Sequence, residues 1–343
     1  MAQPLRATLE QLLERRHLTE AQAGELLVAL TDPEVAPAMA GALLAALRSK
    51  GVTADEVRGL AGAMRRLARR PRISPGPAIV DVVGTGGDAS GSFNLSTGTA
   101  LLAAACGLRV VKHGNRAVSS RSGSADLLEA LGMRIPLDES AAGQCLDATG
   151  FTFLFAPHYH PALKALAPIR SALGVRTVFN MLGPLANPAE PPFHLIGAFS
   201  LEAAELIAQT LSGMAIERAF VVHGEPGWDE PTPVGPFALF DVRPGSVAQQ
   251  VREAAHYGLK SCSSADLAGG DVSHNAAALR AVFEGRDRGA HRDALLIGAA
   301  LTLELTGREN DPRRAVDHAA AVIDSGQARD LLDRLARFGA AAP

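Results

Sequence analysis

Cysteines are few in this chain and lie far apart in the sequence. Only 3 occur among 343 residues, at Cys106, Cys145 and Cys262, and none forms a CxxC pair. This spacing fits neither a structural zinc site nor a disulfide framework. We therefore expect a protein that works in the reducing cytoplasm.

Long apolar runs and an excess of basic residues are also absent. No uninterrupted apolar run approaches the roughly 18 residues that a membrane-spanning helix needs. Charges interrupt the apolar stretches of the first 16 residues, so we expect neither a membrane protein nor a signal peptide. The chain has 33 Lys and Arg against 36 Asp and Glu, a formal net charge of −3. General nucleic-acid binders need a basic surface that displaces counterions, so no nucleic-acid partner is expected and any anion site must be local.

The first part of the chain has the apolar spacing of helices. Up to residue 70, leucines recur every three or four positions, which is the period of an amphipathic helix. Thr19–Gln22 and Thr53–Glu56 have the spacing of capping boxes. We predict four short helices and no strand before residue 71. Five arginines cluster where this helical segment ends: Arg65, Arg66, Arg69, Arg70 and Arg72. We expect them to form the solvated end of a helix rather than a nucleic-acid-binding patch.

A second unit is expected after a hinge. Pro71–Pro77 contains three prolines and a glycine, which break the helical pattern. After residue 78, short apolar runs alternate with stretches of helical spacing such as Leu201–Leu211, which predicts a mostly parallel central sheet covered by helices. The runs are residues 79–83, 100–105, 108–112, 125–131, 151–156, 195–199 and 219–223.

The expected fold class is α/β, with a small N-terminal all-helical domain and a larger sheet domain. We place the helical domain at residues 1–70, completed by helices near 160–185, the hinge linker at 71–78 and the α/β domain at 79–343. Ligands of open parallel sheets bind at the carboxyl ends of the strands. The segments with unusual polar residues fall at such ends.

A glycine-rich loop, Gly84–Asp88, follows the first apolar run. It lacks the GxGxxG of dinucleotide folds and the GK[ST] of P-loops, but glycines allow backbone N–H groups to approach a ligand closely. Small polar residues at 92–97 then mark the expected start of a helix, whose free N–H groups favour anions. Gly-rich turns of this kind are also common without a ligand.

A second loop makes a ligand site more plausible than a simple turn. Lys112–Arg116 supplies a compact cation for phosphate and an amide at Asn115, while Arg116 could brace the loop or contact a ligand. Ser119–Ser124 adds hydroxyl donors. The two loops together predict a phosphate site.

Three further segments carry candidate site residues. Asp229–Glu230 follows an expected strand, and adjacent carboxylates suit Mg²⁺ that shares its shell with phosphates, although two solvated loop acids would look the same. In Phe155–Pro161 the prolines and the missing third ligand disfavour a metal site, so His158 and Tyr159 are expected to line an aromatic pocket. Arg170 could form a bidentate pair with a carboxylate, or be a surface charge.

These segments, together with Arg176–Pro188, resemble the anthranilate phosphoribosyltransferases over nearly the whole chain. The resemblance implies a homodimer associated through the helical domain, with 5-phosphoribosyl 1-pyrophosphate (PRPP) and two Mg²⁺ ions per subunit bound between the domains. It implies a cytoplasmic enzyme of tryptophan biosynthesis that makes N-(5-phosphoribosyl)anthranilate and pyrophosphate.

The family's site residues can be transferred by matching its motifs. Those implied to bind PRPP are Gly84, Gly87, Asp88, Ser92, Asn94, Leu95, Ser96, Thr97, Lys112, His113, Gly114, Asn115, Arg116, Ala117, Val118, Ser119, Ser120 and Ser124. The implied Mg²⁺ ligands are Ser96, Asp229 and Glu230. Anthranilate is expected to contact Gly84, Asn115 and Arg170, with His158 and Tyr159 beside it. The expected catalytic residues are Lys112, Asn115, Arg170 and His113, the last as a candidate proton acceptor.

Two positions depart from the pattern expected of the family. Pro231 stands in place of an aliphatic residue, and Gly298 in place of an asparagine. They leave room for a paralogue that uses another aromatic amine. The sequence also leaves open a nucleoside phosphorylase and a non-catalytic relative that binds nucleic acid.

Overall fold

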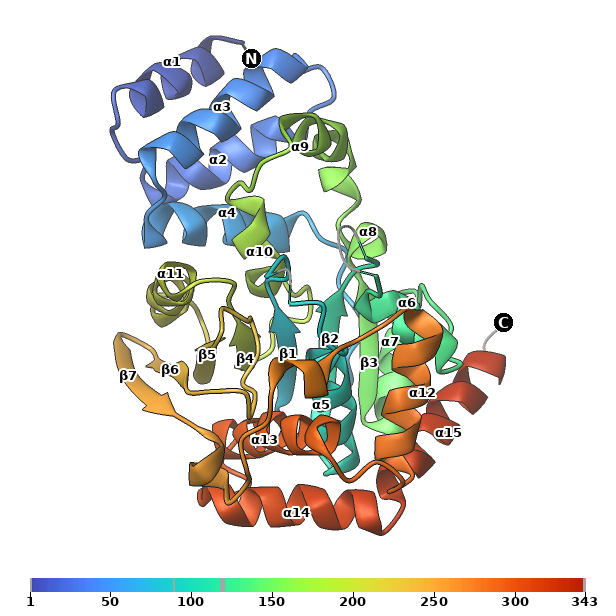
Figure 1. The fold of residues 1–343 in the computed structure, drawn as a ribbon. Helices are drawn as coiled ribbons and strands as arrows, with labels where there is room; N and C mark the ends of the chain where they lie inside the picture. Colours follow the sequence, from blue (N-terminus) through green and yellow to red (C-terminus); the bar gives the residue numbers. More distant parts are fainter. Residues whose placement is uncertain (1, 89, 118–120, 342–343) are drawn as a thin grey trace.

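The computed structural model describes residues 2–88, 90–117 and 121–341, and Figure 1 shows a helical bundle beside a larger sheet-containing part. The helices of the first half are α1 (Ala2–Leu13), α2 (Glu20–Leu30), α3 (Pro37–Lys50), α4 (Ala54–Arg66), α5 (Leu95–Ala105), α6 (Ser124–Ala130), α7 (Glu139–Thr149), α8 (Ala156–Tyr159), α9 (Ala167–Leu173) and α10 (Phe179–Leu185). Those of the second half are α11 (Leu201–Ser212), α12 (Val272–Phe283), α13 (Ala290–Leu305), α14 (Pro312–Asp324) and α15 (Gln327–Ala341). Short 3-10 helices lie at Pro161–Leu166, Ala254–Tyr257 and Ser264–Leu267.

Two of the N-terminal helices, α2 and α4, start where the sequence predicts, whereas Asp32-Pro33, which has the pattern of a cap followed by a first-turn proline, does not start α3, whose N-cap is Ala36. Among described residues before 71, the structure has the four helices α1–α4 and no strand. Both capping boxes form, with Thr19 before α2 and Thr53 before α4. Each threonine hydroxyl accepts from an N–H that a free helix start would leave unpaired.

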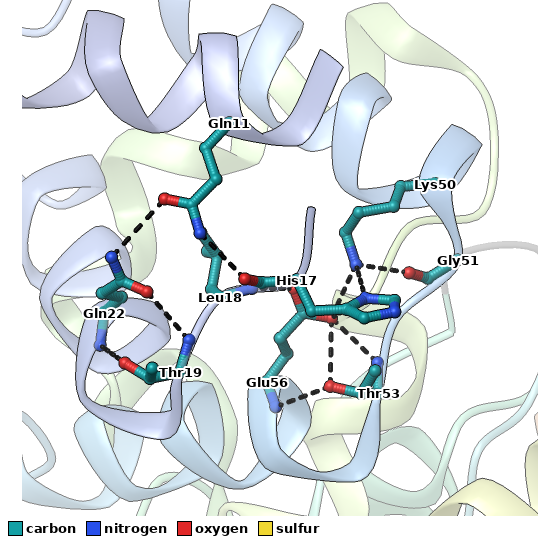
Figure 2. Close-up of polar contacts among 9 residues, drawn as sticks. All are labelled: Gln11, His17, Leu18, Thr19, Gln22, Lys50, Gly51, Thr53 and Glu56. Atoms are coloured by element: carbon teal, nitrogen blue, oxygen red, sulfur yellow. Dashed lines mark hydrogen bonds and ion pairs between the residues drawn. The ribbon is translucent and has the colours of Figure 1, made fainter. Parts of the chain in front are cut away.

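Glu56 ties these helices together, as Figure 2 shows. Its buried carboxylate accepts from Leu18 N at 2.8 Å, from Thr53 N at 2.9 Å and from Lys50 Nζ at 2.8 Å. Lys50 Nζ also lies 2.8 Å from His17 Nδ1. One charged pair thus joins the α1–α2 connection, the end of α3 and the start of α4.

The central sheet has seven strands in the order β3-β2-β1-β4-β5-β6-β7. Pairing is parallel from β3 to β5, which confirms the mostly parallel sheet, and antiparallel for β6 and β7. The strands are β1 (Ile79–Gly84), β2 (Arg109–Gly114), β3 (Phe151–Phe155), β4 (Phe193–Gly197), β5 (Arg218–Gly224), β6 (Phe237–Arg243) and β7 (Ser246–Arg252).

Some expected runs have another structure. Residues 100–105 and 125–130 belong to the helices α5 and α6, because an apolar run buried on several sides looks alike in a strand and a helix. Strands β6 and β7 are missing from the prediction. β7 is mostly exposed, so its sequence, SVAQQVR, has no apolar pattern that would mark a strand.

Two hydrophobic cores lie on opposite faces of the sheet. On β5, Ala219 and Val221 belong to the core with α1–α4, α10 and α11, whereas Phe220 and Val222 belong to the core with α5 and α12–α15. This alternation follows from the two-residue period of a strand. The sheet therefore positions the loops at its strand ends between two packed layers of helices.

The linker after α4 contains no helix or strand but is held to the larger part. Arg69 N donates to Tyr159 O, and Arg72 N donates to Glu139 O, each at 2.8 Å. Arg65 is buried and its Nε donates to Leu185 O at 2.8 Å. The predicted solvated face is therefore wrong for Arg65, because that side chain bridges α4 and α10.

The described helices include none with the length and apolarity needed to cross a membrane.

Candidate active site

The glycine loop after β1 lies against the acidic loop after β5. Gly86 N donates to Asp229 Oδ2 at 2.6 Å, and Asp229 N donates to Asp88 Oδ2 at 3.2 Å. Thr85 N donates to Gly197 O, at the end of β4, at 2.9 Å. Since β1, β4 and β5 are neighbours in the sheet, their carboxyl ends form one site.

Glycines at two of these strand ends make room for the acidic loop. A Cβ at Gly84 would lie 2.5 Å from Asp229 Oδ2, and a Cβ at Gly197 would lie 1.6 Å from Asp229 O. The second distance is far inside any van der Waals contact and involves backbone. Gly197 was not among the predicted site residues, because in the sequence it lies inside an apolar run without a motif.

Glu230 lies at the N-terminus of α5. Its Oε1 accepts from Ser96 N at 3.1 Å, in the first turn, where free N–H groups favour negative charge. Lys112 Nζ lies 3.3 Å from Ser96 Oγ and donates to Val82 O at 2.5 Å. The structure thus places Lys112 with all three predicted metal ligands.

The electrostatics of this cluster fit a divalent cation. Burial raises the pKa of Asp229 to about 7, and the nearby Asp88 carboxylate adds to this effect. Burial, followed by Asp229, also raises the pKa of Glu230 well above its ordinary value. Burial lowers the pKa of Lys112, opposed by Asp81, Glu230 and Asp229. Bringing a cation to these oxygens would remove the repulsion among the carboxylates.

The donor set suits Mg²⁺ rather than zinc. Among described residues there is no group of three or more His, Cys, Asp or Glu side chains that could hold a metal ion. Mg²⁺ does not need such a cage, because it keeps waters and shares its shell with substrate phosphates. Two carboxylates and a serine hydroxyl beside the predicted phosphate loop would be enough for that role.

The second loop is organised by Asp126 and Arg116. Asp126 Oδ2 accepts from Ala117 N at 3.0 Å and from Gly123 N at 3.1 Å. Arg116 contacts Asp126 and forms a two-pronged pair with Glu129, so it braces the loop in this structure. Asp126 is a functional candidate that the sequence analysis missed, although it occupies the N3 position of a helix start. The predicted contacts Val118, Ser119 and Ser120 lie outside the described residues.

Other predicted PRPP contacts surround the start of α5. Two backbone hydrogen bonds hold segment 91–93 against residues 267–269. Phe93 N donates to Leu267 O at 3.0 Å, and Gly269 N donates to Gly91 O at 2.8 Å. Ser92 Oγ lies 3.0 Å from Ser90 Oγ. The side chains of Leu95 and Thr97 are buried, and Leu95 N donates to Phe93 O at 2.6 Å, so the backbone N–H of Thr97 is what this pair can offer to an anion. Ser124 Oγ donates to Asn115 O at 3.0 Å, and Gly114 ends β2 beside it.

His113 is a poor candidate for the proton acceptor. Burial lowers its pKa to about 3, and His160 adds to this effect. Its Nδ1 lies 3.2 Å from Gly183 O, an acceptor, so the ring donates there. At neutral pH such a histidine takes up almost no proton, and its contacts indicate that it joins β2 to α10.

The residues that are expected to contact anthranilate do not contact one another as a group in the described part of the structure. Arg170 is exposed on α9, with its guanidinium carbon 5.0 Å from the ring centre of Phe179. Tyr159 is fully buried and its hydroxyl donates to Leu137 O at 3.2 Å. His158 Nε2 lies 3.5 Å from a Glu139 oxygen. The side-chain polar contacts of His158 and Tyr159 are thus with residues 137–139, and no described contact links either residue to Asn115 or Arg170.

The two unusual positions leave this machinery in place. Gly298 allows α13 to approach α5, because a Cβ there would lie 2.3 Å from Thr99 Oγ1. Thr99 therefore fills the space that a larger residue at 298 would need. Pro231 is buried directly after Glu230.

Comparisons with known proteins identify both parts of the chain. Residues 76–329 match the glycosyl transferase family a/b domain, and residues 6–68 match its helical bundle domain. The chain is 42% identical to the anthranilate phosphoribosyltransferase of Pelotomaculum thermopropionicum, over 97% of this chain and 96% of the relative.

Solved structures give the same result. The chain resembles anthranilate phosphoribosyltransferase from Thermus thermophilus with a TM-score of 0.91 and 40% identity, covering 97% of this chain and 99% of that one. It resembles the Saccharomyces cerevisiae enzyme in complex with PRPP and Mg with a TM-score of 0.90 and 26% identity, covering 98% of both chains. That yeast enzyme has also been solved with 4-fluoroanthranilate. With fold and sequence shared over nearly its full length, this chain belongs to the anthranilate phosphoribosyltransferase family.

Proposed function

We propose that this chain transfers the phosphoribosyl group of PRPP to anthranilate, giving N-(5-phosphoribosyl)anthranilate and pyrophosphate in tryptophan biosynthesis. The observation that carries the proposal is the meeting of Asp229 and Glu230 with the glycine loop and the N-terminus of α5, next to Lys112. This arrangement combines anion donors with metal ligands. Membership of the family and the yeast enzyme's complexes with PRPP, Mg and 4-fluoroanthranilate support it.

The chain's residues would act mainly on the leaving pyrophosphate. Negative charge grows on its oxygens as the bond to the ribose C1 breaks, and preorganised N–H groups and an ammonium stabilise that charge. The Thr97 N–H in the first turn of α5 and the Lys112 ammonium are placed for this. Bound Mg²⁺, held by Ser96, Asp229 and Glu230, would supply further positive charge.

The acceptor needs to be held rather than activated. The anthranilate amine is a neutral nucleophile, so the main requirement is alignment with the ribose C1, and no strong base is needed. We assign Arg170 to the carboxylate of anthranilate and Asn115 and Gly84 to its other contacts. The remaining PRPP contacts are those transferred from the family in the 84–97 and 112–124 segments.

A fluorescence assay tests the function directly. Purified protein with PRPP, Mg²⁺ and anthranilate is expected to consume the anthranilate fluorescence, and no loss of signal at high enzyme concentration would refute the proposal. Parallel reactions with other aromatic amines, and with a nucleoside plus phosphate, identify a paralogue or a phosphorylase.

The metal assignment predicts the effect of removing both charges. Asp229→Asn with Glu230→Gln is expected to lower kcat at saturating PRPP by at least about 100-fold, the loss typical of one transition-state charge contact, and to raise the Mg²⁺ concentration needed. The matched control is Asp330→Asn with Asp333→Asn, two exposed acids on α15. Full activity of the first variant would contradict the assignment, and magnesium titration of activity measures it.

We also propose a cytoplasmic homodimer that associates through the helical domain and binds two Mg²⁺ ions per subunit. Leu13 at the end of α1 and Val28 in α2 have exposed fractions of 67% and 46%, as residues of an interface would in a single chain. Sedimentation of wild type and of Leu13→Glu with Val28→Glu tests the dimer. A monomeric wild type would refute it.

A further inference from the structure

A directed series of amide hydrogen bonds, here called the amide relay, runs through Asn275 of α12. Gly270 N donates to Asn275 Oδ1 at 2.8 Å, and Asn275 Nδ2 donates to Asn94 Oδ1 at 2.8 Å. Asn94 Nδ2 then donates to Ser122 O at 3.0 Å. The relay therefore connects α12, the start of α5 and the second phosphate loop.

The ends of the relay fix the orientation of both amides. A backbone N–H such as that of Gly270 can only donate, and a backbone carbonyl such as that of Ser122 can only accept. Asn275 must therefore turn its oxygen to Gly270 and its nitrogen to Asn94, and Asn94 must turn its nitrogen to Ser122. Asn275 is only 2% exposed, so water does not readily replace these partners.

The side chain of Asn94 does not cap the helix that it precedes. It is the N-cap residue of α5, yet its side chain makes no capping hydrogen bond. One amide hydrogen is used on Ser122 O, and the second remains available at the helix N-terminus, where anions bind. The neighbouring backbone is held separately by the bonds of residues 91 and 93 to residues 267–269, so Asn275 acts on the side chain.

We propose that Asn275 is a positioning residue for PRPP, which aims the Asn94 amide at the phosphate oxygens. The proposal rests on the proposed function, because Asn94 is a PRPP contact only there. Asn275 itself touches no substrate in this scheme. Its effect passes through Asn94.

Asn275→Asp is the sharpest single change. The aspartate still accepts from Gly270 N, but its other oxygen faces Asn94 Oδ1. If Asn94 turns over, its oxygen faces Ser122 O instead, so neither orientation is satisfied. We expect the KM for PRPP to rise about ten-fold, the size of one lost charge-assisted hydrogen bond, with a smaller change in kcat and a thermal unfolding midpoint lowered by only a few degrees, the cost of one unsatisfied buried group. An unchanged KM would overturn the proposal. The matched control is Ala277→Asp, which adds the same charge to an exposed position of α12.

A double-mutant cycle separates positioning from general structural support. The dissociation constant of PRPP with Mg²⁺ is measured by titration calorimetry for wild type, Asn94→Ala, Asn275→Ala and the double variant. Because Asn275 acts through Asn94, its substitution is expected to weaken binding in the wild type and to have no further effect once Asn94 is alanine. Additive effects would overturn the proposal. Should Asn275→Ala fail to fold, Asn275→Asp takes its place in the cycle.

The cycle requires no turnover, so it is independent of the acceptor. If the wild type binds PRPP but does not consume anthranilate, the proposed function fails and the cycle still decides the role of Asn275. If the wild type does not bind PRPP, both proposals fail.

Discussion

At the scale of single residues, a hydrogen atom in place of a methyl group decides whether the acidic loop can lie at the strand ends. The Asp229 backbone passes over Gly197 so closely that a Cβ would lie 1.6 Å from its carbonyl oxygen. Any other residue must push the loop away from β4. Both carboxylates of the cluster would move with it.

Gly197→Ala is therefore expected to be far more damaging than its size suggests. A displacement of about 1 Å in a catalytic group can cost about 100-fold in rate, and we expect at least that loss in kcat/KM for PRPP. The control is Gly41→Ala in α3, whose nearest neighbour is Leu173 Cδ2 at 3.9 Å. Steady-state fluorescence kinetics measure both variants, and a Gly197→Ala enzyme with normal kcat/KM would contradict the geometry.

The residues that could be predicted from the sequence share one property. Lys112, Asp229 and Glu230 have distinctive chemistry and lie at or after the end of an apolar run, so the strand-end rule places them together. Asn275 could not be found in this way, because its role comes from Asn94, which is distant in the sequence. Asp126 has partners nearby in the sequence, but an acidic residue in the first turn of a helix is an ordinary feature that marks no site. A single buried asparagine in a helix carries no signal of its own.

At the scale of secondary-structure elements, Glu56 holds α2, α3 and α4 in register. Burial by itself would raise the pKa of Glu56, but hydrogen bonds from Lys50 and from the backbone of Leu18 and Thr53 outweigh it. The pKa in the folded protein is therefore below the ordinary value of 4.5. Folding favours the ionised carboxylate.

The stability that Glu56 contributes should depend on pH. A carboxyl group with a lowered pKa contributes fully above its unfolded value of 4.5 and loses the contribution as the pH falls through its folded pKa. We expect Glu56→Gln to lower the free energy of unfolding by about 2–3 kcal/mol at pH 7, as for a hydrogen bond to a charged group, and the difference from wild type to shrink below the unfolded value. Urea unfolding of both proteins across this range measures it, with the exposed Glu25→Gln as control. A difference that is constant with pH would exclude the assignment.

Helices and strands differ in how clearly the local sequence predicts them. The bundle helices have capping boxes and clear apolar periods, and the parallel strands β1, β2, β3, β4 and β5 are apolar because both of their faces are covered. The edge strand β7 has no covered face, and α5 is apolar all round because it is buried between the sheet and α13. Burial in the folded protein, which local sequence does not report, explains each of these differences.

At the scale of the whole molecule, the helical bundle reaches the glycine loop through Arg176. Arg48 of α3 donates to Arg176 O, and the Arg176 guanidinium donates to Gly87 O. The same guanidinium carbon lies 4.3 Å from the ring centre of Phe199. Arg176 thus connects the bundle to the predicted PRPP loop across the two parts of the chain.

Replacing Arg176 should loosen that loop without disturbing either core. We expect Arg176→Met to raise the KM for PRPP several-fold, on the order of one hydrogen bond, and Arg176→Lys to recover part of the loss, since lysine keeps the charge but not the planar group. Arg329→Met, an exposed arginine of α15, is the control. Equal KM values for Arg176→Met and wild type, from the fluorescence assay, would contradict the connection.

The sharing of one core between the bundle and the sheet has a consequence for synthesis on the ribosome. The core that contains Leu43 and Leu60 also contains Leu182 of α10, Val221 of β5 and Val242 of β6. The first helices therefore leave the ribosome long before their packing partners exist. The parts of their apolar faces that pack on α10, β5 and β6 stay uncovered until residues near 242 have been made, so the core of the bundle is completed long after its helices have been synthesised.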